Sequence, residues 1–345
     1  MSAKECKYLY KYRGAKNNDF LNRDLTSIKN NTFFAASREK LNDPYEGMFQ
    51  QHELYATLTG LQIITRSEEI RKITQQDLPE TLDFVNTMGV FSLSNTPLNE
   101  LMWSHYGDGH HGFCIEYKSD KLISFQDSHS SYFIEVNYQE ILPKLRPRHL
   151  LTSSEKSEEI VKIMLGTKSI PWHYENEVRL VTQAEGSYLY DFRAVECIYF
   201  GLRCKEDTKR KIMQMLAGKN IKYKQIVCIK DSYGLTATDM PDAFQQENSY
   251  MINMANIAEG AVDPESTLDV YKPYNDHLKK AAEIVRRTPY CIEVNYVSFS
   301  SGSTSENPLI YVRSKVNYNT PCGSIVDHYF TSQEIDNLCR VYKIT

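Results

Sequence analysis

Apolar and polar residues alternate with a period of two in many short stretches of this chain, the pattern of half-buried β-strands. In residues 7–13, Tyr8, Tyr10 and Tyr12 alternate with Leu9, Lys11 and Arg13. Residues 91–94 alternate apolar and hydroxyl side chains. The same pattern predicts strands at 32–36, 113–117, 131–138, 175–181, 195–201 and 221–229. The first two thirds of the chain are therefore predicted to form a sheet.

Helical periodicity lies between these strands. Residues 19–30, 51–88 and 100–106 fit helices, and a capping-box spacing from Thr152 to Glu155 predicts a helix start that continues to about Leu165. A helix at 206–217 joins the strands predicted at 195–201 and 221–229. Such a strand–helix–strand unit pairs its strands in parallel when both lie in one sheet.

The character of the chain changes near residues 231–242, which are rich in Ser, Gly, Thr, Asp and Pro. We expect a domain boundary there, dividing residues 1–235 from 236–345. In the second part, the residue pattern predicts helices at 242–259 and 276–287, followed by strands at 291–299, 309–318 and 324–331 in an antiparallel meander. The predicted fold class is α+β: a mixed-sheet domain with a polar cleft, followed by a smaller α+β binding or docking module for a protein partner.

Composition narrows the class of protein. The 345 residues are 41% hydrophobic and carry a formal net charge of −4, which disfavours a general nucleic-acid coat. Eight cysteines are scattered without a Cys-x-x-Cys pair, which predicts reduced thiols and a cytoplasmic location. The first residues lack the apolar core of a signal peptide, and no run is long enough to span a membrane.

Residues 91–117 are the densest stretch, predicted as strand, short helix, glycine loop and strand. The loop Gly107–Gly112 matches Gly-x-Gly-x-x-Gly, but a dinucleotide-binding turn needs the strand before it and the helix after it. The order here is inverted, so we reject a Rossmann interpretation. His105, His110, His111 and Cys114 fit no common zinc spacing, so no metal site is predicted.

Several strings together resemble a known family. They are Leu9-Tyr-Lys-Tyr-Arg13, Phe34-Ala-Ala-Ser37, Asn42-Asp-Pro-Tyr-Glu46, Trp103-Ser-His-Tyr-Gly107, Gly112-Phe-Cys-Ile-Glu116, Lys168, Trp172, Tyr174-Glu-Asn-Glu-Val-Arg179 and Tyr199-Phe-Gly201. In this order they resemble the bacterial domain-of-unknown-function family numbered 2971, over about residues 7–230. That family has no settled activity. The resemblance implies a cytoplasmic accessory protein, with some members in phage-defence settings.

A looser resemblance is to arginine-type ADP-ribosyltransferases, which combine an early-strand arginine, a Ser-x-Ser strand and a Glu-x-Glu strand. Arg13, Ser92-Leu-Ser94 and Glu175-Asn-Glu177 come in that order. In alternating strands, Ser92 and Ser94 share one face, as do Glu175 and Glu177. An arginine can hold a dinucleotide phosphate with two hydrogen bonds, and a carboxylate steadied by serine can stabilise an oxocarbenium-like ribose.

This resemblance implies an enzyme that uses NAD, with an acceptor, protein or nucleic acid, that the sequence does not identify. Glu177 would be catalytic, and Glu177→Gln would abolish NAD turnover while leaving folding nearly intact. Glu175 and Ser92 would assist catalysis. Arg13 and Ser92 would approach the two carboxylates from neighbouring strands, and an Arg13 on the other sheet face would contradict the transferase interpretation. The residues expected to bind NAD are Arg13, Ser94, Trp103, His105, Tyr106 and Tyr174.

Two other functions stay open. The same polar face is typical of a nucleotide- or protein-binding domain without chemistry, in which the charges are cross-strand ion pairs. The third is a metal-dependent nuclease, although no nuclease spacing is present. Its candidate ligands are Asp43, Glu46, Glu116, Glu175 and Glu177.

Overall fold

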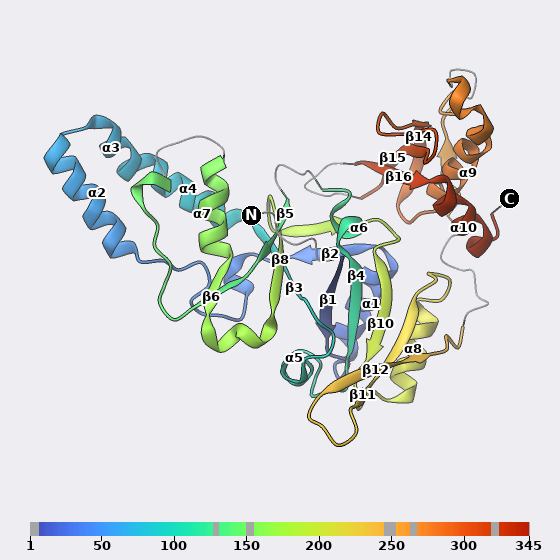
Figure 1. The fold of residues 1–345 in the computed structure, drawn as a ribbon, viewed down its shortest axis with the longest axis horizontal. Helices are drawn as coiled ribbons and strands as arrows, with labels where there is room; N and C mark the ends of the chain where they lie inside the picture. The colour runs from blue at the N-terminus through green and yellow to red at the C-terminus, as the bar shows by residue number, and fades with distance from the viewer. Residues whose placement is uncertain are drawn as a thin grey trace.

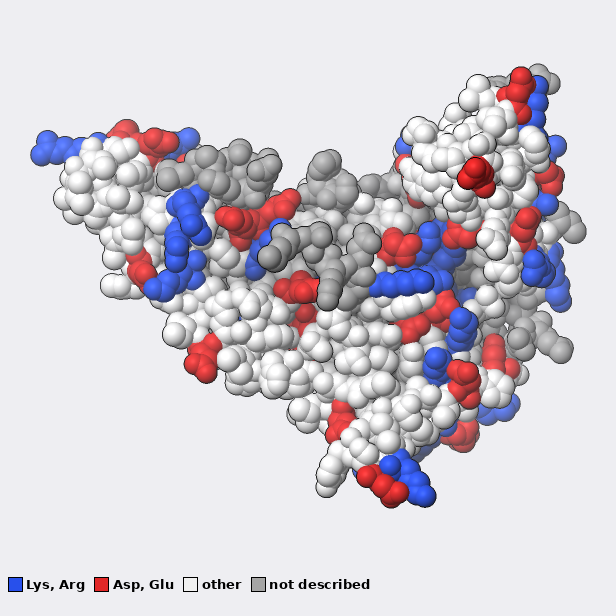
Figure 2. Space-filling view, in the orientation of Figure 1, with Lys and Arg blue, Asp and Glu red and all other residues white. Residues whose placement is uncertain are grey.

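A computed structural model describes residues 7–126, 131–149, 155–244, 253–262, 268–318 and 324–344, without the side chains of 155–157. The fold is α+β, as predicted, with one large mixed sheet and a smaller C-terminal sheet (Figure 1). A helical arm, formed by helices between residues 51 and 87 and at 155–165, lies on one side of the large sheet, and the C-terminal lobe with the smaller sheet lies on the other side (Figure 1). Acidic and basic side chains are interspersed on the visible surface (Figure 2). No helix among the described residues is long and apolar enough to cross a bilayer.

The large sheet has eight strands in the order β12-β11-β10-β4-β1-β3-β8-β5. The strands are β1 (Tyr8–Arg13), β3 (Gly89–Ser94), β4 (Phe113–Lys118), β5 (Tyr132–Glu135), β8 (Glu177–Thr182), β10 (Val195–Phe200), β11 (Lys222–Cys228) and β12 (Leu235–Met240). β10 and β11 pair in parallel and are joined through α8 (Glu206–Met215), which confirms the predicted strand–helix–strand unit. A separate ribbon pairs β2 (Thr32–Ala35) with β9 (Gly186–Leu189).

The two faces of the large sheet are covered differently. Leu21, Leu25 and Ile28 of α1 (Asn18–Lys29) pack with apolar side chains of β1, β3, β4, β8 and β10 on one face, together with Ile212 and Met213 of α8. The other face carries Tyr12, Cys114 and Tyr199 under Trp103 of α5 (Glu100–His105). Both faces are therefore apolar near the middle of the sheet. The buried polar residues Ser94 of β3 and Glu177 and Arg179 of β8 are exceptions to this pattern.

The sheet opens between β1 and β3, the fifth and sixth strands in its order. β1 pairs with β4 through six consecutive residues, from Tyr8↔Lys118 to Arg13↔Phe113. On its other side β1 pairs with β3 at a single position, Tyr10↔Ser94. Beyond that pair the two strands separate, and the unpaired edges leave space for side chains to enter the plane of the sheet.

The helical arm forms from residues that precede and follow β5. It contains α2 (Gln51–Thr65), α3 (Glu68–Lys72), the π-helical turn η2 (Ile73–Asp77), α4 (Leu78–Thr87) and α7 (Glu155–Leu165). Its apolar core, which includes Leu54, Leu78 and Leu165, adjoins Val90 and Val181 of the large sheet. Three short 3-10 turns and a two-stranded ribbon complete this half: η1 (Arg38–Lys40), η3 (Pro147–His149), η4 (Ile170–Glu175), β6 (Asn137–Gln139) and β7 (Thr167–Ser169). The short helix α6 (Ser119–Ile123) directly follows β4.

The C-terminal sheet has the order β13-β14-β15-β16. β14 (Cys291–Phe299), β15 (Leu309–Val316) and β16 (Ile325–Thr331) form the predicted antiparallel meander, and β13 (Asn256–Ile257) adds in parallel. One face packs on α9 (Asn275–Val285) and α10 (Ser332–Tyr342) through Leu278, Val312, Phe330 and other buried side chains. The turn η5 (Asp269–Tyr274) precedes α9.

A loop of the large sheet joins the C-terminal lobe. Phe192 is buried in the core of that lobe, and its ring lies 6.4 Å from the ring of Tyr342. Arg193 forms an ion pair with Glu334 at 3.0 Å and donates to the Tyr329 carbonyl at 2.9 Å. The lobe is thus attached by an inserted aromatic ring and by a buried arginine.

His328 makes this junction sensitive to acid. It is 3% exposed, lies 4.0 Å from Asp191 and faces the ring of Phe125, with Arg193, Asp327 and Lys121 also near. Burial lowers the pKa of His328 from 6.5 to about 4, against the attraction of Asp191. Between these values the unfolded chain binds the extra proton, so stability rises with pH in that window.

We expect the free energy of unfolding to fall by about 2–3 kcal/mol as the pH is lowered from 6.5 to 4, through His328 alone. Urea melts at several pH values measure the slope. His328→Gln should remove this contribution from the slope between pH 6.5 and 4. An unchanged slope in the variant would show that other groups cause it.

Several predicted elements differ from the structure. Glu175 ends η4 and lies outside β8, because Asn176 adopts a left-handed conformation with φ 48° that separates the two elements. Residues 131–138 form two strands, with a break at Val136. The helix predicted at 242–259 is wrong at its C-terminal end, where β13 lies, and 245–252 fall outside the described residues.

The stretch predicted as the domain boundary contains β12, so the large sheet extends to Met240. The division into two domains stays a prediction. The sequence pattern also missed α10, which a capping box between Thr331 and Glu334 starts.

Candidate functional site

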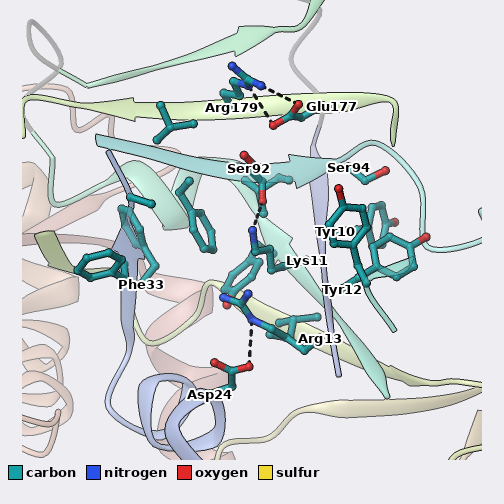
Figure 3. A pocket seen from close by; sticks show the side chains of 18 of the residues that line it. Tyr10, Lys11, Tyr12, Arg13, Asp24, Phe33, Ser92, Ser94, Glu177 and Arg179 are labelled. Atoms are coloured by element: carbon teal, nitrogen blue, oxygen red, sulfur yellow. Dashed lines mark hydrogen bonds and ion pairs between the residues drawn. The ribbon is translucent and has the colours of Figure 1, made fainter. Parts of the chain in front are cut away.

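A cleft of about 590 Å³ lies where β1 and β3 separate (Figure 3). Its lining combines cations, carboxylates and aromatic rings. The cations are Lys11, Arg13, Arg23, Lys40, Lys168 and Arg179, and the carboxylates are Asp24, Glu175 and Glu177. The aromatic residues are Tyr10, Tyr12, Phe33, Phe34, Phe91, Tyr106 and Tyr117.

Lys11 occupies the gap between the strands. Its Nζ donates to the Ser92 carbonyl at 2.6 Å and lies 4.9 Å from the centre of the Phe91 ring. The ammonium thus takes the place of a β1 backbone donor that the widened gap has moved away. Burial, followed by the charge of Arg13, lowers the pKa of Lys11 to about 7, against the opposite effect of Glu177 and Asp24. Lys11 was not among the residues predicted from the sequence, although it lies two residues from Arg13 on the same face of β1.

Arg13 lies on the other sheet face from Glu177. Tyr10 pairs with Ser94, and Ser94 pairs with Glu177, so these side chains share one face. Arg13 is an odd number of residues from Tyr10 and points to the opposite face, where its Nε lies 3.4 Å from Asp24 Oδ2 (Figure 3). The expectation that Arg13 approaches the carboxylates on one face is therefore wrong, and the arginine–serine–glutamate arrangement of arginine-type ADP-ribosyltransferases is not formed by these residues. Arg13 and the carboxylates both line the cleft only because the sheet is open between β1 and β3.

Glu177 is 5% exposed and accepts three hydrogen bonds. Arg179 donates to both oxygens, from Nε at 2.9 Å and Nη2 at 3.0 Å, and Lys168 Nζ lies 3.2 Å from Oε2. Burial alone would raise the pKa of Glu177, but the charges of Arg179 and Lys168, with the hydrogen bonds from Arg179 and a contribution from Ser92, lower it to about 2. A carboxylate has about four acceptor positions, and three of those of Glu177 are taken by these two cations.

Arg179 is the centre of the ion-pair network. It is 0% exposed, donates to both carboxylate oxygens of Glu46 and donates from Nη1 to the Leu165 carbonyl at 2.7 Å. Glu46 comes from the Asn-Asp-Pro-Tyr-Glu turn, 133 residues away in the chain. Burial raises the pKa of Glu46, despite Arg179. One guanidinium therefore holds two carboxylates from distant segments.

Glu175 is less constrained than Glu177. Its carboxylate accepts from the Tyr106 hydroxyl and from Lys168 Nζ, which leaves two acceptor positions without a donor among the described residues. Its backbone carbonyl accepts from Ser94 Oγ at 2.8 Å. Lys168 bridges Glu175 and Glu177, so the two carboxylates meet across the η4–β8 junction although they lie on different elements.

Of the nine residues predicted as the site, six line the cleft: Arg13, Ser92, Ser94, Tyr106, Glu175 and Glu177. Trp103, His105 and Tyr174 are not among its lining residues. Trp103 is fully buried and donates to the Pro97 carbonyl at 2.8 Å, which is a structural role. The rings of His105 and Tyr174 lie 5.6 Å apart beside it.

The glycine loop supports the end of β1. A Cβ on Gly112 would lie 2.0 Å from the Arg13 carbonyl oxygen, so only glycine permits this close approach. This packing explains the Gly-x-Gly-x-x-Gly match without a nucleotide. Among the described residues, no three His, Cys, Asp or Glu side chains group as metal ligands. Neither the histidine–cysteine set nor the nuclease set of carboxylates is therefore gathered into a metal site. Glu116, a member of the nuclease set, accepts a hydrogen bond from the Tyr199 hydroxyl at 2.7 Å.

The fold and cleft define an α+β protein with a charged opening in the middle of a mixed sheet. Residues 102–180 match the model of a family described as protein of unknown function (DUF2971). This range carries most of α5, all of β4, and Lys168, Glu175, Glu177 and Arg179. No curated protein and no solved structure matches the chain.

Proposed function

We propose that the cleft binds a nucleotide, with NAD the first ligand to test. The observation that carries the proposal is the uncompensated positive charge on the α1 side of the cleft. Arg13 and Arg23 share one carboxylate, Asp24, and Lys11 has no ion pair with a described residue. Phosphate oxygens are the ligands that such a set of lysine and arginine donors prefers.

Aromatic side chains beside these cations support a base. Phe34 is 50% exposed and lines the cleft, so its ring is accessible to a base. Phe33 and Phe91 also line the cleft but are buried, with their ring centres 4.9 Å apart. Phe34 also has Lys40 Nζ 5.9 Å from its ring. Stacking on an aromatic ring stabilises a bound nucleotide whichever base it carries, because every base has a π-face. Cations and rings in one cleft of this volume match the two chemical parts of a nucleotide.

The experiment compares NAD, ADP and adenosine by titration calorimetry with the full chain. We expect NAD and ADP to bind and adenosine to bind at least about tenfold more weakly, because one or two charge-assisted hydrogen bonds to phosphate are lost. Affinity should fall as the pH rises above about 7, because Lys11 then loses the proton that attracts the phosphate.

Lys11→Gln should keep a donor for the Ser92 carbonyl while abolishing this pH dependence and most of the preference for ADP. Lys230→Gln, at an exposed lysine after β11, is the matched control and should change neither. Equal binding of ADP and adenosine, or no binding of any nucleotide, would contradict the proposal.

A second candidate is ADP-ribosyl transfer from NAD by Glu175, favoured by the two acceptor positions of Glu175 that have no donor among the described residues. It lacks the arginine of arginine-type ADP-ribosyltransferases, because Arg13 lies on the other sheet face from Glu177. In this reaction the bond between ribose C1′ and the nicotinamide nitrogen breaks, and nicotinamide leaves with the electron pair. An acceptor nucleophile forms the new bond to C1′ and loses its proton to a base. Glu175 suits that base, or an acceptor for a ribose hydroxyl, better than Glu177 does, because Arg179 and Lys168 take three of the acceptor positions of Glu177.

A further inference from the structure

The outer face of the C-terminal sheet carries three tyrosines on three adjacent strands, which we call the tyrosine face: Tyr296, Tyr311 and Tyr329. The opposite face packs on α9 and α10, which lie together on one side of the sheet (Figure 1). Tyr296 is 51% exposed and Tyr329 43% exposed. Their rings lie 6.1 Å and 5.3 Å from the ring of Tyr311, which stands between them.

An ion pair holds an arginine among these rings. Arg313 pairs in register with Tyr296 on one side and with Asp327 on the other. Asp327 accepts from Arg313 at 2.8 Å and 2.9 Å and from the Tyr311 hydroxyl at 2.9 Å. The guanidinium carbon lies 5.6 Å from the centre of the Tyr311 ring. Carboxylate, guanidinium and phenol thereby fix one another, so Tyr311 and Arg313 lose little conformational entropy when a ligand binds.

We propose that the tyrosine face binds single-stranded nucleic acid by stacking bases on its rings. Unpaired bases bind aromatic and guanidinium planes on exposed sheet faces, and each stack contributes without reading sequence. Lys315, exposed and two residues beyond Arg313 on the same face, adds a cation for the phosphate backbone.

Charge and spacing favour this ligand over a protein partner. The three rings are neighbours, but the charged side chains of Arg313 and Asp327 lie directly beside them on the same face, and the polar Ser298 pairs in register with Tyr311. A protein interface core would instead be a continuous apolar patch depleted of charge. Because Asp327 offsets Arg313, few phosphates are neutralised, so binding should depend only weakly on salt. This inference is independent of the cleft and of its nucleotide.

The test is fluorescence anisotropy of the full chain with labelled single-stranded RNA and DNA of mixed sequence, about 12 nucleotides long. We expect both to bind, and the corresponding duplexes to bind at least about tenfold more weakly, because paired bases cannot unstack onto the rings. Preference for RNA over DNA would assign a contact to the 2′-hydroxyl, and equal affinity would assign the binding to the bases.

Tyr296→Ala and Tyr329→Ala should each weaken binding about five- to hundredfold, whereas Tyr296→Phe and Tyr329→Phe should restore it because the ring is kept. Tyr233→Ala, at a fully exposed tyrosine in the β11–β12 loop, is the matched control and should change nothing. Thermal melts identify any variant that fails to fold, and the phenylalanine variants then decide. Absence of binding, equal affinity for duplexes, or equal losses in the Tyr233 control would overturn the proposal and leave protein docking as the role of this face.

Discussion

Arg179→Met is expected to lower the free energy of unfolding by about 3–5 kcal/mol. Methionine is about as long as the arginine stem but leaves the carboxylates of Glu46 and Glu177 buried, 7% and 5% exposed, without their guanidinium. Removing one partner of a buried ion pair costs much more than the pair contributes, because the remaining charge cannot regain its hydration. Urea denaturation followed by circular dichroism measures the loss.

Arg71→Met is the control, because Arg71 forms an exposed ion pair with Glu68 on α3. We expect a loss below about 1 kcal/mol there. Adding Glu46→Gln and Glu177→Gln to Arg179→Met should recover part of the stability, since the uncompensated charges then disappear. A loss in Arg179→Met as small as that of the control would show that the network is weaker than its geometry indicates.

The second expected result concerns NAD turnover and follows from the transferase candidate. Glu175→Gln should lower turnover about 10²–10³-fold, the usual cost of removing one group that stabilises charge in the transition state. The glutamine oxygen can still accept from Lys168, and the Tyr106 hydroxyl can turn to accept from the glutamine NH2, so the fold should remain stable. Nicotinamide release, measured by chromatography, is the readout, and thermal melts monitor folding.

Glu177→Gln tests whether the Glu177 carboxylate stabilises the fold. The sequence predicted that it would leave folding nearly intact, but the guanidinium of Arg179 and the ammonium of Lys168 both depend on this carboxylate. We expect a loss of stability as well as any loss of turnover. Full turnover in Glu175→Gln would end the assignment of Glu175. If the wild-type chain releases no nicotinamide while still binding NAD, the transferase candidate fails and nucleotide binding stands.

The polar strings of the sequence identified the right region but not the right partners. The serine and glutamate strings do lie side by side, because β3 and β8 are neighbouring strands in which Ser94 pairs with Glu177. Lys11, Lys168 and Arg179 were not selected as site residues, and Glu46 was considered only as a ligand of the nuclease alternative. All four belong to strings that resemble the family. Lys11 was the most accessible signal, since it lies two residues from Arg13 in the same strand.

The sequence by itself determined the local elements: the strand and helix patterns, the parallel β10–α8–β11 unit and the C-terminal meander. Hydrophobic periodicity records which face of an element is buried, and this information is local. Only the tertiary structure decided that β1 and β3 separate, that Arg13 points away from Glu177, and that Glu46 reaches Arg179 from a distant turn. Strand order and long-range ion pairs depend on how elements pack, and a pattern of single residues does not encode the neighbour that each face will meet.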